Sequence, residues 1–147
     1  MKIRITALSE EHIAVLAELE RLCFSDPWSE NSLREMLTSE TARFFVALVD
    51  EQVAGYMGTH IVCDSAYVDN VAVFPQYRRQ GIAKALFDHV FTMVQANGVE
   101  FISLEVRPSN TSALKLYQSL GFENMGVRPN YYRNPTENAF IMTKIFE

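Results

Sequence analysis

A basic turn near the middle of the chain, Arg78-Arg79-Gln80-Gly81, contains residues that could bind a charged ligand. An apolar run rich in β-formers precedes the turn and ends at Pro75, which has no N–H to give a neighbouring strand. After the turn, apolar residues recur at helical spacing, so a helix is expected to begin there. A helix N-terminus presents unpaired N–H groups, glycine allows close approach of a ligand, and arginine adds positive charge. This stretch therefore predicts an anion site, with a pyrophosphate as the expected ligand.

A purely structural interpretation of the same turn stays open. Gly81 is then an ordinary turn residue, and Arg78 and Arg79 are solvated loop charges. The turn contains neither G-x-x-x-x-G-K-[ST] nor G-x-G-x-x-G, so it is neither a P-loop nor the dinucleotide-binding fingerprint.

A carboxylate, Glu105, lies near the end of a strand predicted over residues 99–106. Apolar residues of this strand alternate with residues that face the other side. A strand between helices is expected to be apolar on both faces, and Glu105 breaks that rule near the carboxyl end, where ligands bind in open α/β sheets. Glu105 has two explanations: it pairs with Arg107 or another cation, or it acts as a general base.

Four aromatic residues stand near these positions in the expected fold. Tyr117 lies on the apolar stripe of a predicted helix, which by itself indicates a core tyrosine whose hydroxyl reaches a partner. Trp28 lies between two predicted helices, where it packs the loop, lines a groove for the acceptor substrate, or does both. Tyr131 and Tyr132 form a cluster just before a predicted turn between the last two strands.

The elements that must hold these side chains follow the order β-α-α-β-β-β-α-β-α-β-β. A strand over residues 2–8 precedes two helices, and a hairpin over residues 43–62 leads into the central strand. The long helix after the basic turn ends at Asn97-Gly98, a good C-terminal cap. The chain contains no repeat, low-complexity segment or linker, so the pattern predicts a mixed α/β fold in a single domain, residues 1–147.

The composition limits the classes of function. Hydrophobic residues make up 48% of the 147 residues and the net charge is -5, which is typical of a globular protein and unlike a broad nucleic-acid-binding surface. An acidic surface favours a basic partner. Cys23 and Cys63 are far apart and the three histidines share no metal-ligand spacing, so we expect a cytoplasmic protein without a metal site. No apolar run approaches the ~20 residues of a membrane span, and a monomer is favoured.

These motifs together resemble the GNAT acetyltransferases over nearly the whole chain. Arg78, Gly81 and Ala83 match the acyl-CoA-binding signature Q/R-x-x-G-x-G/A, and the segments L-E-V-R-P-S-N and A-L-K-L-Y-Q-S-L-G-F are also similar to the family. Within it, C-F-S-D-P-W-S, N-V-A-V and R-P-N-Y-Y resemble the bacterial ribosomal-protein-alanine N-acetyltransferases, the RimI type. Ala83 replaces the glycine of many relatives, a change that the signature allows.

The resemblance implies a mixed, mostly antiparallel sheet flanked by helices, with acetyl-CoA as co-substrate. It also implies that Glu105 is the general base and Tyr117 the general acid, and that Trp28, Tyr131 and Tyr132 line the acceptor site. The residues expected to bind the coenzyme are Val71, Ala72, Val73, Arg78, Arg79, Gln80, Gly81, Ile82, Ala83, Lys84 and Asn110.

The activity implied by the resemblance is acetylation of an N-terminal alanine, expected to belong to a small-subunit ribosomal protein, by direct attack in a ternary complex. An α-amine, with a pKa near ~8, is neutral far more often at pH 7 than a lysine near ~10.4, so it suits a glutamate that acts through a water. Two alternatives stay open: a GNAT enzyme that acetylates lysine side chains or a small-molecule amine, and a non-catalytic acyl-CoA-binding module.

Overall fold

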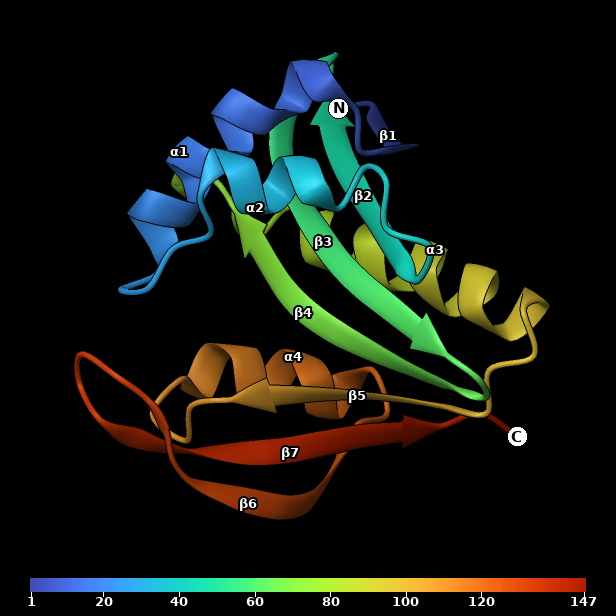
Figure 1. Cartoon of the computed structure of the whole chain (residues 1–147), viewed down its shortest axis with the longest axis vertical. Coiled ribbons are helices and arrows are strands. Elements are labelled where there is room, and N and C mark those ends of the chain that lie inside the picture. Colours follow the sequence, from blue (N-terminus) through green and yellow to red (C-terminus); the bar gives the residue numbers. More distant parts are fainter.

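The computed structural model describes every residue from Met1 to Glu147, and its elements follow the predicted order (Figure 1). Short 3-10 turns at Glu10–His12 and Pro75–Tyr77 precede the first and third helices. None of the helices combines the length and apolar character that a membrane span needs. The strands are β1 (Ile3–Ala7), β2 (Ala42–Val49), β3 (Gln52–Val62), β4 (Ser65–Val73), β5 (Phe101–Val106), β6 (Glu123–Tyr132) and β7 (Glu137–Ile145), and the helices are α1 (Ile13–Cys23), α2 (Glu30–Glu35), α3 (Ile82–Ala96) and α4 (Thr111–Ser119).

All seven strands form one sheet, in the order β1-β2-β3-β4-β5-β7-β6. Every neighbouring pair is antiparallel except β4 and β5, which are parallel. The prediction of a mixed, mostly antiparallel sheet is therefore confirmed. The single parallel pair exists because α3 carries the chain from the end of β4 back to the start of β5.

The parallel pair separates soon after it begins. Residues Ser65–Tyr67 of β4 pair with Phe101–Ser103 of β5, and no further pairs join the two strands. Figure 1 shows them diverging from this contact toward the side where α1 and α2 lie. The second half of β4 therefore has a free edge, next to which a ligand can bind between the strands.

Two apolar clusters cover the two faces of the sheet. One lies under α3 and α4 and contains Phe87, Ile102 and Leu104; the other lies under α1 and α2 and contains Leu16, Leu33 and Phe44. In β5, positions 102, 104 and 106 are buried against α3 while positions 103, 105 and 107 face the other side, as the alternation predicts. Glu105 therefore points to the α1–α2 side of the sheet.

Some predicted boundaries differ from the structure. The central strand begins at Ser65, earlier than its apolar run, because Ser65–Val68, which precede that run, already pair with β3. The strand predicted from residue 99 begins at Phe101, since the N–H of Val99 still bonds to the carbonyl of Val94 at the end of α3. The second helix is short and ends at Glu35, with Met36 as its C-terminal cap.

The close approach of β3 to β4 depends on Gly55. A Cβ atom at this position would lie 2.6 Å from the backbone oxygen of Ala72 and 3.2 Å from the Cα of Val73. We expect Gly55→Ala to lower the free energy of unfolding by about 1–3 kcal/mol, because backbone atoms cannot move aside as a side chain can. The measurement is urea denaturation of the two proteins.

The matched control for this prediction is Gly126→Ala in β6. A Cβ there would meet only the Cδ1 of Ile141, at an ordinary 3.5 Å, so a change within about 0.5 kcal/mol is expected. An equal loss of stability in both variants would show that close packing is not the reason for glycine at position 55.

Candidate active site

A cavity of about 880 Å³ occupies the space between the diverging strands. It is lined by the loop after α1, by the polar half of β4, by the end of β5, by the start of α4 and by the loop between β6 and β7. The predicted site residues that line it are Trp28, Val71, Glu105, Asn110, Tyr117, Tyr131 and Tyr132.

Glu105 is held on both sides of its carboxylate. Its Oε2 accepts a hydrogen bond from the hydroxyl of Tyr67, and its Oε1 accepts one from the Nε of Arg128 at 3.0 Å. The Glu105 side chain is only 5% exposed, whereas that of Arg128 is 55% exposed. Burial raises the pKa of Glu105, and the hydrogen bond and charge of Arg128 oppose that rise.

The ion pair that was one explanation for Glu105 therefore exists, but its partner is Arg128 and not Arg107. Arg128 comes from β6, two strands away in the sheet, and is exposed enough to move without unpacking the core. The two explanations are compatible, since a buried carboxylate beside a mobile cation can also accept a proton.

Tyr117 combines a buried ring with a hydroxyl that has no partner in the protein. The ring is 7% exposed and packs edge-on against Phe87 and Phe122, as expected for a core tyrosine. Its hydroxyl makes no hydrogen bond within the chain, so the expected protein partner is absent. No buried side-chain polar atom lacks a partner, so this hydroxyl is not buried and opens into the cavity. Burial raises the pKa of Tyr117 to about 12, which keeps the phenol protonated and able to donate at neutral pH.

The other nine predicted coenzyme-binding residues lie outside this cavity, at the end of β4 and the start of α3. Gly81 caps α3 with a left-handed backbone (φ 81°), and no side chain satisfies the first N–H groups of the helix. Space around Gly81 is open, with no atom within 4 Å of where a Cβ would stand. These free N–H groups and this open space suit a bound anion such as a pyrophosphate.

Two of the basic side chains of this turn already make hydrogen bonds within the protein. Arg78 bonds to the carbonyl of Val73 at 3.1 Å and Lys84 pairs with Asp88 at 2.8 Å, so both are engaged within the protein. Ile82 is buried in the core below α3 and can offer only its backbone to a ligand. Asn110 likewise uses its side-chain oxygen to cap α4, by accepting from the N–H of Ala113.

Trp28 both packs the loop and lines the cavity. Its ring lies 5.6 Å from that of Phe44, and its backbone N–H donates to the Oε1 of Glu20 at 2.9 Å. Glu20 is fully buried and also accepts from Tyr56 and from Asn70 of β4. Burial raises the pKa of Glu20, while its donors oppose that rise. This carboxylate thus joins α1, the Trp28 loop and the edge strand of the cavity.

Tyr131 and Tyr132 are positioned by Arg107, whose side chain lies 4.4 Å from the centre of the Tyr132 ring. The guanidinium also donates to the carbonyls of Arg133 and Pro135 and pairs with Glu137 at 3.2 Å. Arg107 therefore fixes the loop between β6 and β7 to the end of β5, which keeps both tyrosines at the edge of the cavity.

Sequence reasoning missed three of these residues, Tyr67, Arg128 and Glu20, and also the loop-holding role of Arg107. Only Glu20 carried a local signal, because a charged residue on the apolar stripe of a helix requires buried partners. Tyr67 and Arg128 lie 38 and 23 residues from Glu105 in the sequence, so no spacing rule connects them to it.

The fold and this arrangement define a class of enzyme. The chain belongs to the acetyltransferase (GNAT) family, whose pattern matches residues 13–122, and the predicted resemblance is thereby confirmed. The [ribosomal protein bS18]-alanine N-acetyltransferase of Escherichia coli K12 is 35% identical to it over 144 residues, 94% of each chain. The Haemophilus ducreyi protein of the same name is 36% identical over 143 residues, 94% of this chain and 97% of that protein.

Solved structures agree with this assignment. The crystal structure of the Escherichia coli ribosomal-protein-S18-alanine N-acetyltransferase matches with a TM-score of 0.89 and 33% identity, over 98% of this chain and 94% of that one. Ard1 from Thermoplasma volcanium matches with a TM-score of 0.91 over 100% and 99% of the two chains, but at 23% identity it shows only a shared fold.

Arg128 makes the pH dependence of Glu105 testable. Its hydrogen bond and charge favour the ionised carboxylate, so Arg128→Met should raise the pKa of Glu105. If Glu105 acts as a base, the acid limb of the kcat/KM profile then moves to higher pH, and activity falls more at pH 6 than at pH 8. The measurement is kcat/KM across pH 5–9.

Arg4→Met is the control for this profile, because Arg4 pairs with the exposed Glu51 and has no contact with the cavity. Its acid limb should coincide with that of the unchanged protein. An unmoved acid limb in Arg128→Met would mean that the limb reports a group other than Glu105.

Proposed function

We propose that this enzyme transfers the acetyl group of acetyl-CoA to the α-amine of the N-terminal alanine of ribosomal protein bS18. The observation that supports this most directly is the meeting, in one cavity, of a buried carboxylate held by two donors and a protonated tyrosine whose hydroxyl has no protein partner. The identity of about 35% with bS18-alanine acetyltransferases, over 94% of the chain, supports the choice of substrate.

Acetyl-CoA as co-substrate fits two features of the fold. The edge of β4 at Val71 and at the N–H of Val73 can pair with an extended, amide-containing arm as an added strand would, whereas the carbonyl of Val73 already accepts from Arg78. The first turn of α3 follows that edge in the chain, and no side chain caps its N–H groups. Gly81 lets a pyrophosphate approach these N–H groups closely.

In the proposed reaction, one residue of the cavity accepts the proton of the amine and another donates a proton to the leaving group. The amine attacks the thioester carbon, a C–N bond forms, and the amine proton passes to Glu105 directly or through a water. N–H groups of the free β4 edge stabilise the charge on the carbonyl oxygen. As the C–S bond breaks, Tyr117 gives its proton to the leaving thiolate, so both protons are accounted for and no covalent enzyme intermediate is needed.

The test is thiol release from acetyl-CoA with two forms of one alanine-starting ribosomal peptide that contains lysine, one with a free and one with a blocked N-terminus. Turnover is expected only with the free N-terminus. Glu105→Gln and Tyr117→Phe should each lower kcat/KM by about 10²- to 10⁴-fold, the range for a lost general base or acid.

Glu51→Gln is the control, since this exposed residue lies outside the cavity. Acetyl-CoA binding by the Glu105 and Tyr117 variants should stay unchanged, because the coenzyme-binding elements are intact. Equal turnover of the two peptides would instead identify lysine as the acceptor. Bound acetyl-CoA without any turnover would contradict the proposal and favour another amine or a binding module.

A further inference from the structure

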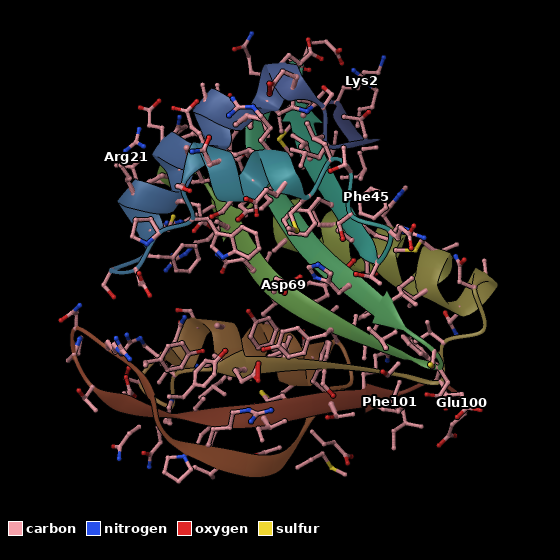
Figure 2. All side chains as sticks on the ribbon, in the orientation of Figure 1. Lys2, Arg21, Phe45, Asp69, Glu100 and Phe101 are labelled. Atoms are coloured by element: carbon pink, nitrogen blue, oxygen red, sulfur yellow. The ribbon has the colours of Figure 1, made fainter.

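A second carboxylate, Asp69, faces the same cavity from the opposite strand, and neither the general base nor the general acid of the proposed mechanism uses it. Figure 2 shows Asp69 on β4, beside the opening between that strand and β5. Its side chain is 16% exposed, so it is largely removed from bulk water yet reachable from the cavity.

Asp69 faces the cavity because of a β-bulge. The register between β3 and β4 shifts between the pairs Gly58–Asn70 and Thr59–Val68, which leaves Asp69 without a partner. Two consecutive side chains then point to the α1–α2 side of the sheet: Asn70 bonds to Glu20 of α1, and Asp69 bonds to a side chain of β3 on that same face. A regular strand would have turned one of them toward α3.

One oxygen of Asp69 is engaged and the other is free. Its Oδ2 bonds to the Nδ1 of His60, whose ring packs edge-on against Phe44 at 6.0 Å and is thereby fixed. Its Oδ1 accepts no hydrogen bond from the protein, and since no buried polar side-chain atom is unsatisfied, this oxygen is open to a ligand. His60 therefore holds the Asp69 carboxylate in one orientation, with Oδ1 available to accept a hydrogen bond from a ligand.

Neither of the two arginines that line the cavity pairs with Asp69. Arg107 pairs with Glu137, and Arg133 makes no ion pair with Asp69. Arg128 pairs with Glu105. Burial also raises the pKa of Asp69, with the His60 hydrogen bond opposing, and a partly desolvated carboxylate gains more from an added cation than a hydrated one.

We propose that Asp69, held by His60, binds a cationic side chain, arginine or lysine, at the second or third residue of the peptide substrate. A side chain fits better than the α-amine, because an anion beside the α-ammonium would hinder the loss of the proton that attack requires. A charge that stays positive throughout the reaction carries no such cost. This inference rests on the proposed peptide acetylation and adds a charge preference to it.

The test uses pairs of alanine-starting peptides that differ only in arginine or uncharged citrulline, at position 2 in one pair and position 3 in the other. The enzymes are the unchanged protein, Asp69→Asn, and Asp26→Asn as a matched control, since Asp26 is an exposed acid lining the same cavity. We expect about a tenfold preference for arginine in kcat/KM at one of the two positions, the size of one charge-assisted pair. Asp69→Asn should lose it to within about twofold, and Asp26→Asn should keep it.

The inference is overturned if the unchanged enzyme shows no arginine preference, or if Asp69→Asn lowers kcat/KM equally for both members of a pair. Calorimetric titration with the same peptides gives the preference as a ratio of Kd values even without turnover, so failure of the proposed acetylation is distinguishable from failure of this charge preference. If Asp69→Asn does not fold, the preference of the unchanged enzyme should still shrink as KCl rises from 50 to 500 mM; a salt-independent preference would contradict a charge pair.

Discussion

The short contact between β4 and β5 is the constraint on which the rest of the site depends. Only three residue pairs join these strands before they separate, and the cavity is the space that this separation leaves. A fully paired sheet would use the edge of β4 for its own ladder and would close the opening between this edge and β5. Because the strands diverge, one edge and two opposed carboxylates become available to ligands while the sheet stays continuous at the other end.

Keeping the strands apart requires the two sides of the opening to be held independently. Glu20 connects α1, the Trp28 loop and Asn70 on one side, through three hydrogen bonds to a fully buried carboxylate. On the other side Arg107 holds the β6–β7 loop to the end of β5. The buried charge of Glu20 would be costly without full partnering, and the partners of both Glu20 and the partly exposed Arg107 come from other elements. The polar groups therefore set the shape of the opening, while the two apolar clusters supply the stability of each face.

Much of the fold could be predicted because local patterns decide it. The alternation in β5, the helical spacing after Gly81 and the cap at Asn97-Gly98 each follow from neighbouring residues, and the structure reproduces them within a few residues. One error, the late start predicted for β4, lies where the polar residues Tyr67, Asp69 and Asn70 of this strand line the cavity. One face of the strand lines the cavity at these positions, so a pattern of apolar residues that assumes two buried faces does not predict the strand.

The order of the elements follows from the residue patterns alone, and the resemblance carried by the R-R-Q-G-I-A turn also points to Glu105 and Tyr117, the two side chains that the proposed chemistry needs. The groups that surround these two side chains are visible only in the folded chain: Arg128 and Tyr67 hold Glu105, the Tyr117 hydroxyl is left free, and a bulge turns Asp69 into the cavity. The physical reason is that periodicity and turn chemistry act over a few residues. Strand register and the direction of a buried side chain depend instead on packing between segments that lie tens of residues apart.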